Sequence, residues 1–301
     1  MIPTPPPEAS GTTRTTLVPL WWGAWGAAEA PPVVLLHGGP GAHHDYLLPQ
    51  LLHLADAHRV ITYDQRGGGR SRTDDPAPIG WQTHVADLTA VLAELPTGRA
   101  PVLVGYSWGA LLAMAYAIEA VRGAAGPVPR ALALLSPAAV TAGFKRESEA
   151  AFAARAASPA VQALRDAHAA DPRRTSNPAA WRQRAFEVAV APWFHDPSLA
   201  HDLTPFRLVE RVQRSTWESL GEYDLRPGLA EVRAAGTVKA LVVSGRDDPI
   251  PLASAKAAAD ALGAPCVALD ACGHVPYVEA PVALFAALDP FLRTVTGPGP
   301  A

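Results

Sequence analysis

Residues 102–110 read VLVGYSWGA, and the fold follows from this stretch. The apolar run Val102–Val104 is typical of a buried strand, and a helical pattern follows over Ala110–Arg122. Between them, Gly105–Gly109 form a G-x-S-x-G sequence, which places a serine on a sharp turn from strand to helix. Glycines on both sides of the serine let the backbone pass close to neighbouring chain. The stretch predicts an α/β fold with a nucleophilic Ser107 at the carboxyl end of a strand.

The alternation of strand and helix continues on both sides of this stretch. Short apolar, β-branched runs predict strands that are buried on both faces of a parallel sheet. These runs are Val33–Leu36, Val60–Tyr63, Val102–Val104, Ala131–Leu135, Val238–Ser244 and Cys266–Leu269. Helical patterns lie over Trp81–Leu95, Ala110–Arg122, Leu252–Leu262 and Pro281–Val295. With an antiparallel strand pair or a Trp-rich loop over Thr13–Trp25, the pattern predicts a doubly wound, mostly parallel α/β sheet.

The alternation stops after Leu135 and resumes at Val238. The residues between are rich in Ala, Arg, Glu and Trp, and their X-Pro boundaries predict short helices joined by turns. Because ligands bind outside the carboxyl ends of the strands in such sheets, we expect these helices to cap that edge. We predict a flexible Pro-rich tail over residues 1–13, a core over 14–137 and 238–296, and a helical cap, inserted after the sixth strand, over 138–237.

A serine nucleophile needs a base that takes its proton and an acid that orients the base. His274 lies on a glycine-containing loop after the last predicted strand, from which it can reach back over the sheet, and we expect it to be the base. The other histidines lie in early loops and helices or in the predicted cap, where a solvated surface position is the simpler interpretation. The acid is expected after the strand Val238–Ser244, where Asp247 and Asp248 are both candidates.

The glycine-rich run His37–Gly41, HGGPG, follows the strand Val33–Leu36 and leaves backbone N–H groups bare beside the nucleophile. Such donors stabilise the oxyanion of an acyl-transfer intermediate, each by about 3–4 kcal/mol. We assign the N–H groups of Gly39 and Trp108 to this oxyanion hole. A phosphate-binding loop is the alternative interpretation, but no G-x-G-x-x-G or Walker spacing follows.

Composition narrows the class of protein. The 301-residue chain is 49% hydrophobic and 18% charged, which is typical of a globular protein. Its formal net charge of −3, with no run of basic residues longer than two, argues against a nucleic-acid partner. Cys266 and Cys272 provide neither a disulfide framework nor a zinc site, so we expect a reducing, cytoplasmic location. We expect no metal and no cofactor, and we leave the oligomeric state open.

Two segments bear on membrane association. Met1–Arg14 is rich in proline and lacks the apolar stretch of a signal peptide or an anchor. Ala100–Ile118 carries no charge and is long enough to span a bilayer. Because Gly105, Ser107 and Gly109 interrupt it, we interpret it as a buried strand and a buried helix, and we expect no membrane contact.

Three motifs resemble those of the proline iminopeptidase-like serine peptidases of the α/β-hydrolase superfamily. They are HGGPG at 37–41, DQRGGGRS at 64–71 and GYSWG at 105–109, with GRDDPIP at 245–251 and GHVPYVE at 273–279 similar to the acid and histidine loops of the family. The resemblance covers the core and implies the α/β-hydrolase fold, with its Ser, Asp, His order along the chain. It gives the acid role to Asp248. For Asp64 and Arg66 we expect a structural turn with a local ion pair.

Aminopeptidases of this kind hold the free α-amino group of the substrate with carboxylates of the cap or loops. Trp217-Glu218 resembles a Trp-Glu pair in the cap of the family, so the resemblance implies that Glu218 binds an ammonium group. Glu222 is a second candidate, and solvation of a helix end is the alternative interpretation for both glutamates. We also expect Tyr106 and Trp217 to contact the substrate.

These observations predict a metal-independent serine hydrolase with an acyl-enzyme mechanism, in which Ser107, His274 and Asp248 form the triad. The resemblance implies an aminopeptidase that releases an N-terminal proline or small residue from short peptides or amides. A carboxylesterase or lactonase of small molecules is the close alternative. A non-catalytic receptor that encloses a small ligand under the cap is the alternative from a different class.

Overall fold

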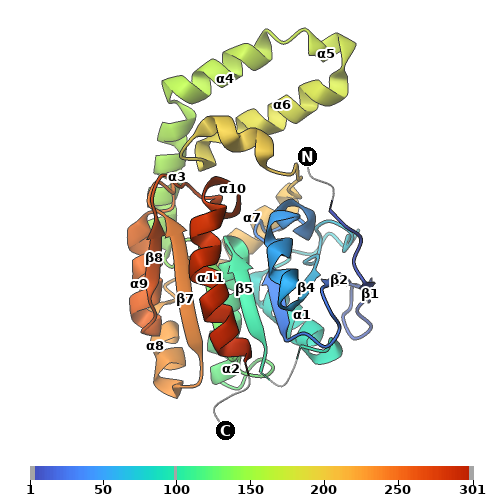
Figure 1. Cartoon of the computed structure of the whole chain (residues 1–301), viewed down its shortest axis with the longest axis vertical. Coiled ribbons are helices and arrows are strands. Elements are labelled where there is room, and N and C mark those ends of the chain that lie inside the picture. Colours follow the sequence, from blue (N-terminus) through green and yellow to red (C-terminus); the bar gives the residue numbers. More distant parts are fainter. Residues whose placement is uncertain (1–3, 98–99, 298–301) are drawn as a thin grey trace.

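A computed structural model describes residues 4–97 and 100–297 of the chain. Within them, eight strands form one sheet in the order β1-β2-β4-β3-β5-β6-β7-β8 (Figure 1). The strands are β1 (Ala9–Thr12), β2 (Trp21–Trp25), β3 (Pro32–Leu36), β4 (Arg59–Tyr63), β5 (Val102–Tyr106), β6 (Ala131–Leu135), β7 (Lys239–Gly245) and β8 (Cys266–Leu269). Strands β3 to β8 pair in parallel, whereas β2 is antiparallel to both of its neighbours. The predicted mostly parallel sheet is confirmed.

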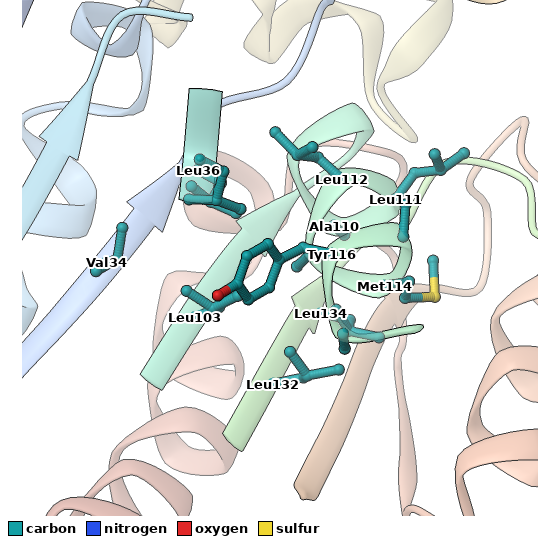
Figure 2. Close-up of a cluster of buried hydrophobic side chains, with 14 of the residues drawn as sticks. Val34, Leu36, Leu103, Ala110, Leu111, Leu112, Met114, Tyr116, Leu132 and Leu134 are labelled. Atoms are coloured by element: carbon teal, nitrogen blue, oxygen red, sulfur yellow. The ribbon is translucent and has the colours of Figure 1, made fainter. Parts of the chain in front are cut away.

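Helices cover both faces of the sheet because alternate strand residues point to opposite sides. One face packs against α1 (Trp81–Glu94), α2 (Trp108–Val121), α8 (Arg226–Ala235) and α9 (Leu252–Leu262). Figure 2 shows Leu103 and Leu132 of the strands within this layer. The other face, with Val104 and Ala133, packs against α11 (Pro281–Thr296) and the 3₁₀ helices η1 (His44–Leu47) and η2 (Gln50–Asp56). Near-continuous apolar strands are what burial on both faces requires.

A helical insertion follows β6 and lies beyond the carboxyl ends of the parallel strands (Figure 1). It contains α3 (Ala142–Ala156), α4 (Pro159–Ala169), α5 (Arg173–Ser176), α6 (Pro178–Val190), η3 (Ala191–Trp193), η4 (Pro197–Asp202) and α7 (Glu210–Leu220). Helix α3 leads away from the core, and α4, α5 and α6 form an arch above it. The short helix α10 (Pro276–Glu279) follows β8. The insertion therefore stands over the edge at which β5 and β7 end.

Two boundaries differ from the prediction. Strand β1 lies within the segment predicted as a loose tail over residues 1–13, because its backbone pairs with β2 from Ala9 to Thr12; residues 1–3 lie outside the described residues. Helix α8 lies within the predicted cap over 138–237 but packs against α2 and α9 on the sheet. The apolar side chains of Leu229 and Val232 lie on one face of the helix, and they are buried because this face packs against the helices that cover the sheet.

The charge-free stretch Ala100–Ile118 contributes to both the sheet and a helix. It forms β5 and most of α2, with Ser107 between them. In the described part of the chain, none of the helices has the length and apolar character needed to cross a membrane.

Candidate active site

Ser107 occupies the sharp turn between β5 and α2 that the sequence predicts. Its backbone has φ 53° and ψ −120°, a strained conformation for a residue with a side chain. The flanking glycines are required by contact: a Cβ on Gly109 would lie 2.1 Å from the Leu36 carbonyl oxygen, and one on Gly105 would lie 2.5 Å from that of Gly109. Close backbone packing therefore holds the serine at the carboxyl edge of the sheet.

The structure brings Ser107, His274 and Asp248 together. His274 Nε2 lies 2.9 Å from Ser107 Oγ, and its Nδ1 lies 2.8 Å from Asp248 Oδ2. The other carboxylate oxygen of Asp248 accepts the Ile250 N–H at 2.8 Å, so the acid is fixed on both sides. Asp247, the other acid candidate, points elsewhere and lies 3.0 Å from His195 Nδ1. Serine, imidazole and carboxylate thus form a continuous hydrogen-bonded array.

Two backbone N–H groups beside Ser107 are available to a ligand. Gly38 donates its N–H to Tyr46 Oη at 2.7 Å, whereas the N–H groups of Gly39 and Trp108 have no acceptor among the residues that the structure describes. Trp108 is the first residue of α2, where the N–H groups and the helix dipole favour a negative charge. Gly39 has φ 124°, a conformation that glycine adopts readily. Trp108 follows Ser107 in the chain and Gly39 lines the same cavity as the serine, so both predicted oxyanion donors lie beside Ser107.

Gln65 of the DQRG motif joins the HGGPG loop to the nucleophile helix. Its side chain donates to the His37 carbonyl at 2.8 Å and accepts from Trp108 Nε1 at 2.8 Å, while its own N–H donates to His37 Nε2 at 3.0 Å. Burial lowers the pKa of His37 to about 4, so its ring is neutral at pH 7 and can accept this bond. These buried bonds fix the glycine loop against Ser107.

Asp64 and Arg66 do not form the local ion pair expected for this turn. Asp64 is fully buried and accepts bonds from His44, at 2.7 Å from Nδ1, and from the Arg70 N–H at 2.8 Å. Arg66 reaches instead to Asp87 of α1, at 2.8 Å. A partner on a distant helix is invisible to a local pattern, and the role of the turn is structural as expected.

Two cavities meet at Ser107. The larger, about 530 Å³, lies under α3 and α7 and is lined by Ser107, Gly39, Trp217 and charged cap residues. Those charged residues are Lys145, Glu149, Glu210 and Arg214. The smaller, about 110 Å³, is mainly apolar and is lined by aromatic side chains that include Tyr46, Tyr106, Trp193, Phe206 and Tyr277. The nucleophile thus faces a charged chamber on one side and an aromatic one on the other.

Of the four residues considered for substrate contact, two line the cavities at Ser107 and two do not. Trp217 lines the charged cavity and Tyr106 the aromatic one. Glu218 is exposed and lines neither, because neighbouring helical residues point about 100° apart and Trp217 takes the inward position. Glu222 pairs with Arg146 on the surface, at 2.7 Å. Both glutamates therefore lie outside the two cavities in this structure, as the alternative interpretation of a solvated helix end expects.

Sequence reasoning missed the carboxylates that do line the charged cavity, Glu149 on α3 and Glu210 on α7. Glu149 pairs with Lys145, and Glu210 lies 4.0 Å from Arg214. Both are ordinary members of Ala-, Arg- and Glu-rich helical patterns, so no local signal distinguishes them from solvated glutamates. Only the packing of the cap on the core selects them.

Cys272 is fully buried and close to His274 in sequence. Burial raises the pKa of its thiol, so it carries no reactive thiolate at neutral pH. Cys272 belongs to the buried apolar cluster on the α11 face of the sheet.

Comparisons with known proteins identify proteins that resemble this chain in sequence and in fold. A proline iminopeptidase from Lactobacillus helveticus is 43% identical over 93 residues, a match that spans 30% of this chain and 31% of that relative. The structure superposes on a proline iminopeptidase from Mycobacterium smegmatis with a TM-score of 0.67 at 22% identity, covering 96% of this chain and 99% of the other. An enol-lactonase from Burkholderia xenovorans LB400 gives a TM-score of 0.63 at 25% identity, covering 94% and 99%.

The partial match to the Lactobacillus relative covers less than a third of either chain, and the Mycobacterium structure shows a shared fold. A longer sequence match than that to the Lactobacillus relative comes from a protein family. Residues 33–288, which run from β3 to α11, match the alpha/beta hydrolase family. The predicted α/β-hydrolase fold and the resemblance to proline iminopeptidases are confirmed. The chain belongs to the alpha/beta hydrolase family.

Proposed function

We propose that this chain is a serine hydrolase that works through an acyl-enzyme. The hydrogen-bonded array of Ser107, His274 and Asp248 carries this proposal, because each distance allows direct proton transfer or orientation. Ser107 attacks the substrate carbonyl while His274 Nε2 takes its proton. The N–H groups of Gly39 and Trp108 stabilise the oxyanion. His274 then protonates the leaving group, and the same residues activate a water molecule that releases the acid.

We further propose that the substrate carries a free N-terminal proline or small residue, so that the enzyme is an aminopeptidase. Glu149 and Glu210 line the same cavity as Ser107, and a carboxylate is the natural partner of a substrate ammonium. The similarity to proline iminopeptidases supports this assignment. The limited volume of the cavities favours short peptides or amides.

The charges of the cavity also support a second candidate, a carboxylesterase or lactonase. Lys145 pairs with Glu149, and Arg214 lies near Glu210, so each carboxylate already has a cationic neighbour. A neutral ester would need neither glutamate, and the enol-lactonase shares the fold at 25% identity. The two candidates differ in their need for a free amine.

The experiment compares kcat/KM for L-prolyl and L-alanyl anilides with that for the N-acetylated anilides, with Ser107→Ala as the blank. The aminopeptidase proposal expects turnover of the free amines alone. Equal turnover of acetylated substrates would contradict amine recognition. Turnover of small esters or lactones without either anilide would establish the second candidate.

A further inference from the structure

The loop that carries His274 lies directly against the cap. His274 donates its backbone N–H to the Trp193 carbonyl at 2.7 Å. A Cβ on the preceding Gly273 would lie 2.3 Å from the same carbonyl oxygen and 2.7 Å from the His195 nitrogen. The Trp193 ring also packs on the imidazole, with centroids 4.6 Å apart. The position of the base is therefore coupled to the cap segment Trp193–His195.

One carboxylate joins the two segments. Glu279, the last residue of α10, accepts the His195 N–H with Oε1 at 2.6 Å. Its Oε2 accepts the N–H groups of Gly273 at 2.9 Å and Val275 at 3.3 Å. Gly273 and Val275 are the two chain neighbours of His274. A single side chain thus ties both flanks of the base to the cap.

Glu279 lies outside the hydrogen-bonded array at Ser107 and outside the two cavities that meet there. Its side chain is partly buried, and burial raises the pKa of its carboxyl group, whereas the backbone N–H groups that donate to it favour the ionised form. The exposed pair between His195 and Asp247 connects the same cap segment to the acid loop. An exposed pair of this kind contributes little on its own.

We propose that Glu279 is a positioning residue for His274, holding the base loop and the cap segment Trp193–His195 in one register. This inference rests on the proposed serine hydrolase function. Glu279 touches neither substrate nor nucleophile, so its effect passes through the backbone on both sides of the base. Removing the bridge loosens the imidazole relative to Ser107.

The test measures kcat and KM for p-nitrophenyl acetate, together with the rate constant for labelling of Ser107 by a fluorophosphonate. The variants are Glu279→Gln, which keeps the size but loses the charge and one acceptor, and Glu279→Asp, which keeps the charge but shortens the reach. Glu187→Gln is the matched control, because Glu187 is a partly buried glutamate whose partners lie within α6. Permanently inactive molecules lower the final amount of labelled protein but not the first-order rate constant of labelling.

Both Glu279 variants are expected to lose about 10- to 100-fold in kcat and in labelling rate, with KM unchanged, because small displacements of a catalytic group are costly. The control is expected to stay within about twofold of the wild type. A labelling rate near that of the wild type in either Glu279 variant, or a change in KM alone, would overturn the inference. A wild-type enzyme that is not labelled at Ser107 would overturn the proposed function, and this inference with it.

Discussion

The core edge beneath Ser107 and the cap above it are held by contacts of different kinds. In the core, the bonds among Gln65, His37 and Trp108 are buried. In the cap, pairs such as Lys145–Glu149 are largely exposed to solvent. Each exposed pair contributes only about 0–1 kcal/mol, whereas disrupting a buried network leaves polar groups without partners. The comparison indicates that buried contacts fix the groups proposed for the chemistry, whereas the carboxylates proposed to bind the substrate lie in more exposed pairs.

The acid loop offers the largest expected effect. Its two adjacent aspartates have different partners: Asp248 contacts the buried His274, and Asp247 contacts the exposed His195 of the cap. Asp248→Asn is expected to lower kcat by about 10⁴-fold, since asparagine neither stabilises the imidazolium nor holds the correct tautomer. Asp247→Asn, which alters only the exposed contact with His195, is expected to stay within about threefold. Steady-state kinetics on a small ester measure both. Equal losses in the two variants would show that the acid is not fixed as the geometry indicates.

The glycine beside the nucleophile tests how rigid the core is. Gly109→Ala is expected to lower the free energy of unfolding by about 3 kcal/mol, because the added methyl group meets the Leu36 carbonyl. Gly123→Ala is the control: its φ is 76° but no atom lies within 4 Å of the added Cβ, so only about 1 kcal/mol of backbone strain is expected. Urea unfolding measures both. If Gly109→Ala lowered the free energy of unfolding no more than Gly123→Ala does, the core around Ser107 would not be rigid.

Two buried histidines make the core sensitive to acid. Burial lowers the pKa of His37 to about 4 and that of His84 to about 3, against 6.5 in the unfolded chain. Below pH 6.5 the unfolded chain takes up protons that the folded chain does not. The free energy of unfolding therefore decreases as the pH is lowered below 6.5, by roughly 1 kcal/mol per pH unit for each histidine.

His44 does not alter this slope. Burial alone would lower its pKa, but bonds to Asp45 and Asp64 outweigh burial and raise it, so His44 is protonated in both states below pH 6.5. Urea unfolding between about pH 6.5 and 4.5 measures the slope, and His84→Gln is expected to lower it by roughly 1 kcal/mol per pH unit. A free energy of unfolding that stays constant over this range would contradict the assignment.

The cap carboxylates offer the smallest effect and test substrate selection. Glu149→Gln and Glu210→Gln are each expected to lower kcat/KM for free-amine anilides by about tenfold, because a mostly exposed carboxylate binds an ammonium weakly. Glu218→Gln is the control, since Glu218 faces away from the cavity, and its kcat/KM is expected to be unchanged. If Glu218→Gln gave the larger loss, the cap would close in an arrangement different from this one.

The same division explains what the sequence could predict. The strand–turn–helix around Ser107 is a local pattern, as are β8 and α9, whose bounds the hydrophobic pattern predicts to the residue. His274 and Asp248 follow strands, and parallel strands end at one edge, so their approach to Ser107 follows from topology.

Contacts that depend on the packing of distant elements could not be predicted. Strand β1 needs β2 as its partner, and Arg66, which lies in a turn, contacts Asp87 of helix α1. Glu149 and Glu210 reach the cavity only because α3 and α7 present those faces to it. A helical pattern gives the spacing of a face but not its direction, and the resemblance that implies Glu218 fixes a position in the sequence but not the direction of its side chain.

Detection of the acyl-enzyme by intact-protein mass spectrometry tests the central claim most directly. After brief reaction with p-nitrophenyl acetate and rapid acid quenching, the wild-type protein is predicted to gain the mass of one acetyl group, which digestion and peptide mapping are predicted to place on the peptide that contains Ser107. The Ser107→Ala protein is predicted to gain none. An acetyl group that persists in Ser107→Ala at the same stoichiometry, or turnover by Ser107→Ala at the wild-type rate, would contradict the assignment of Ser107 as the nucleophile.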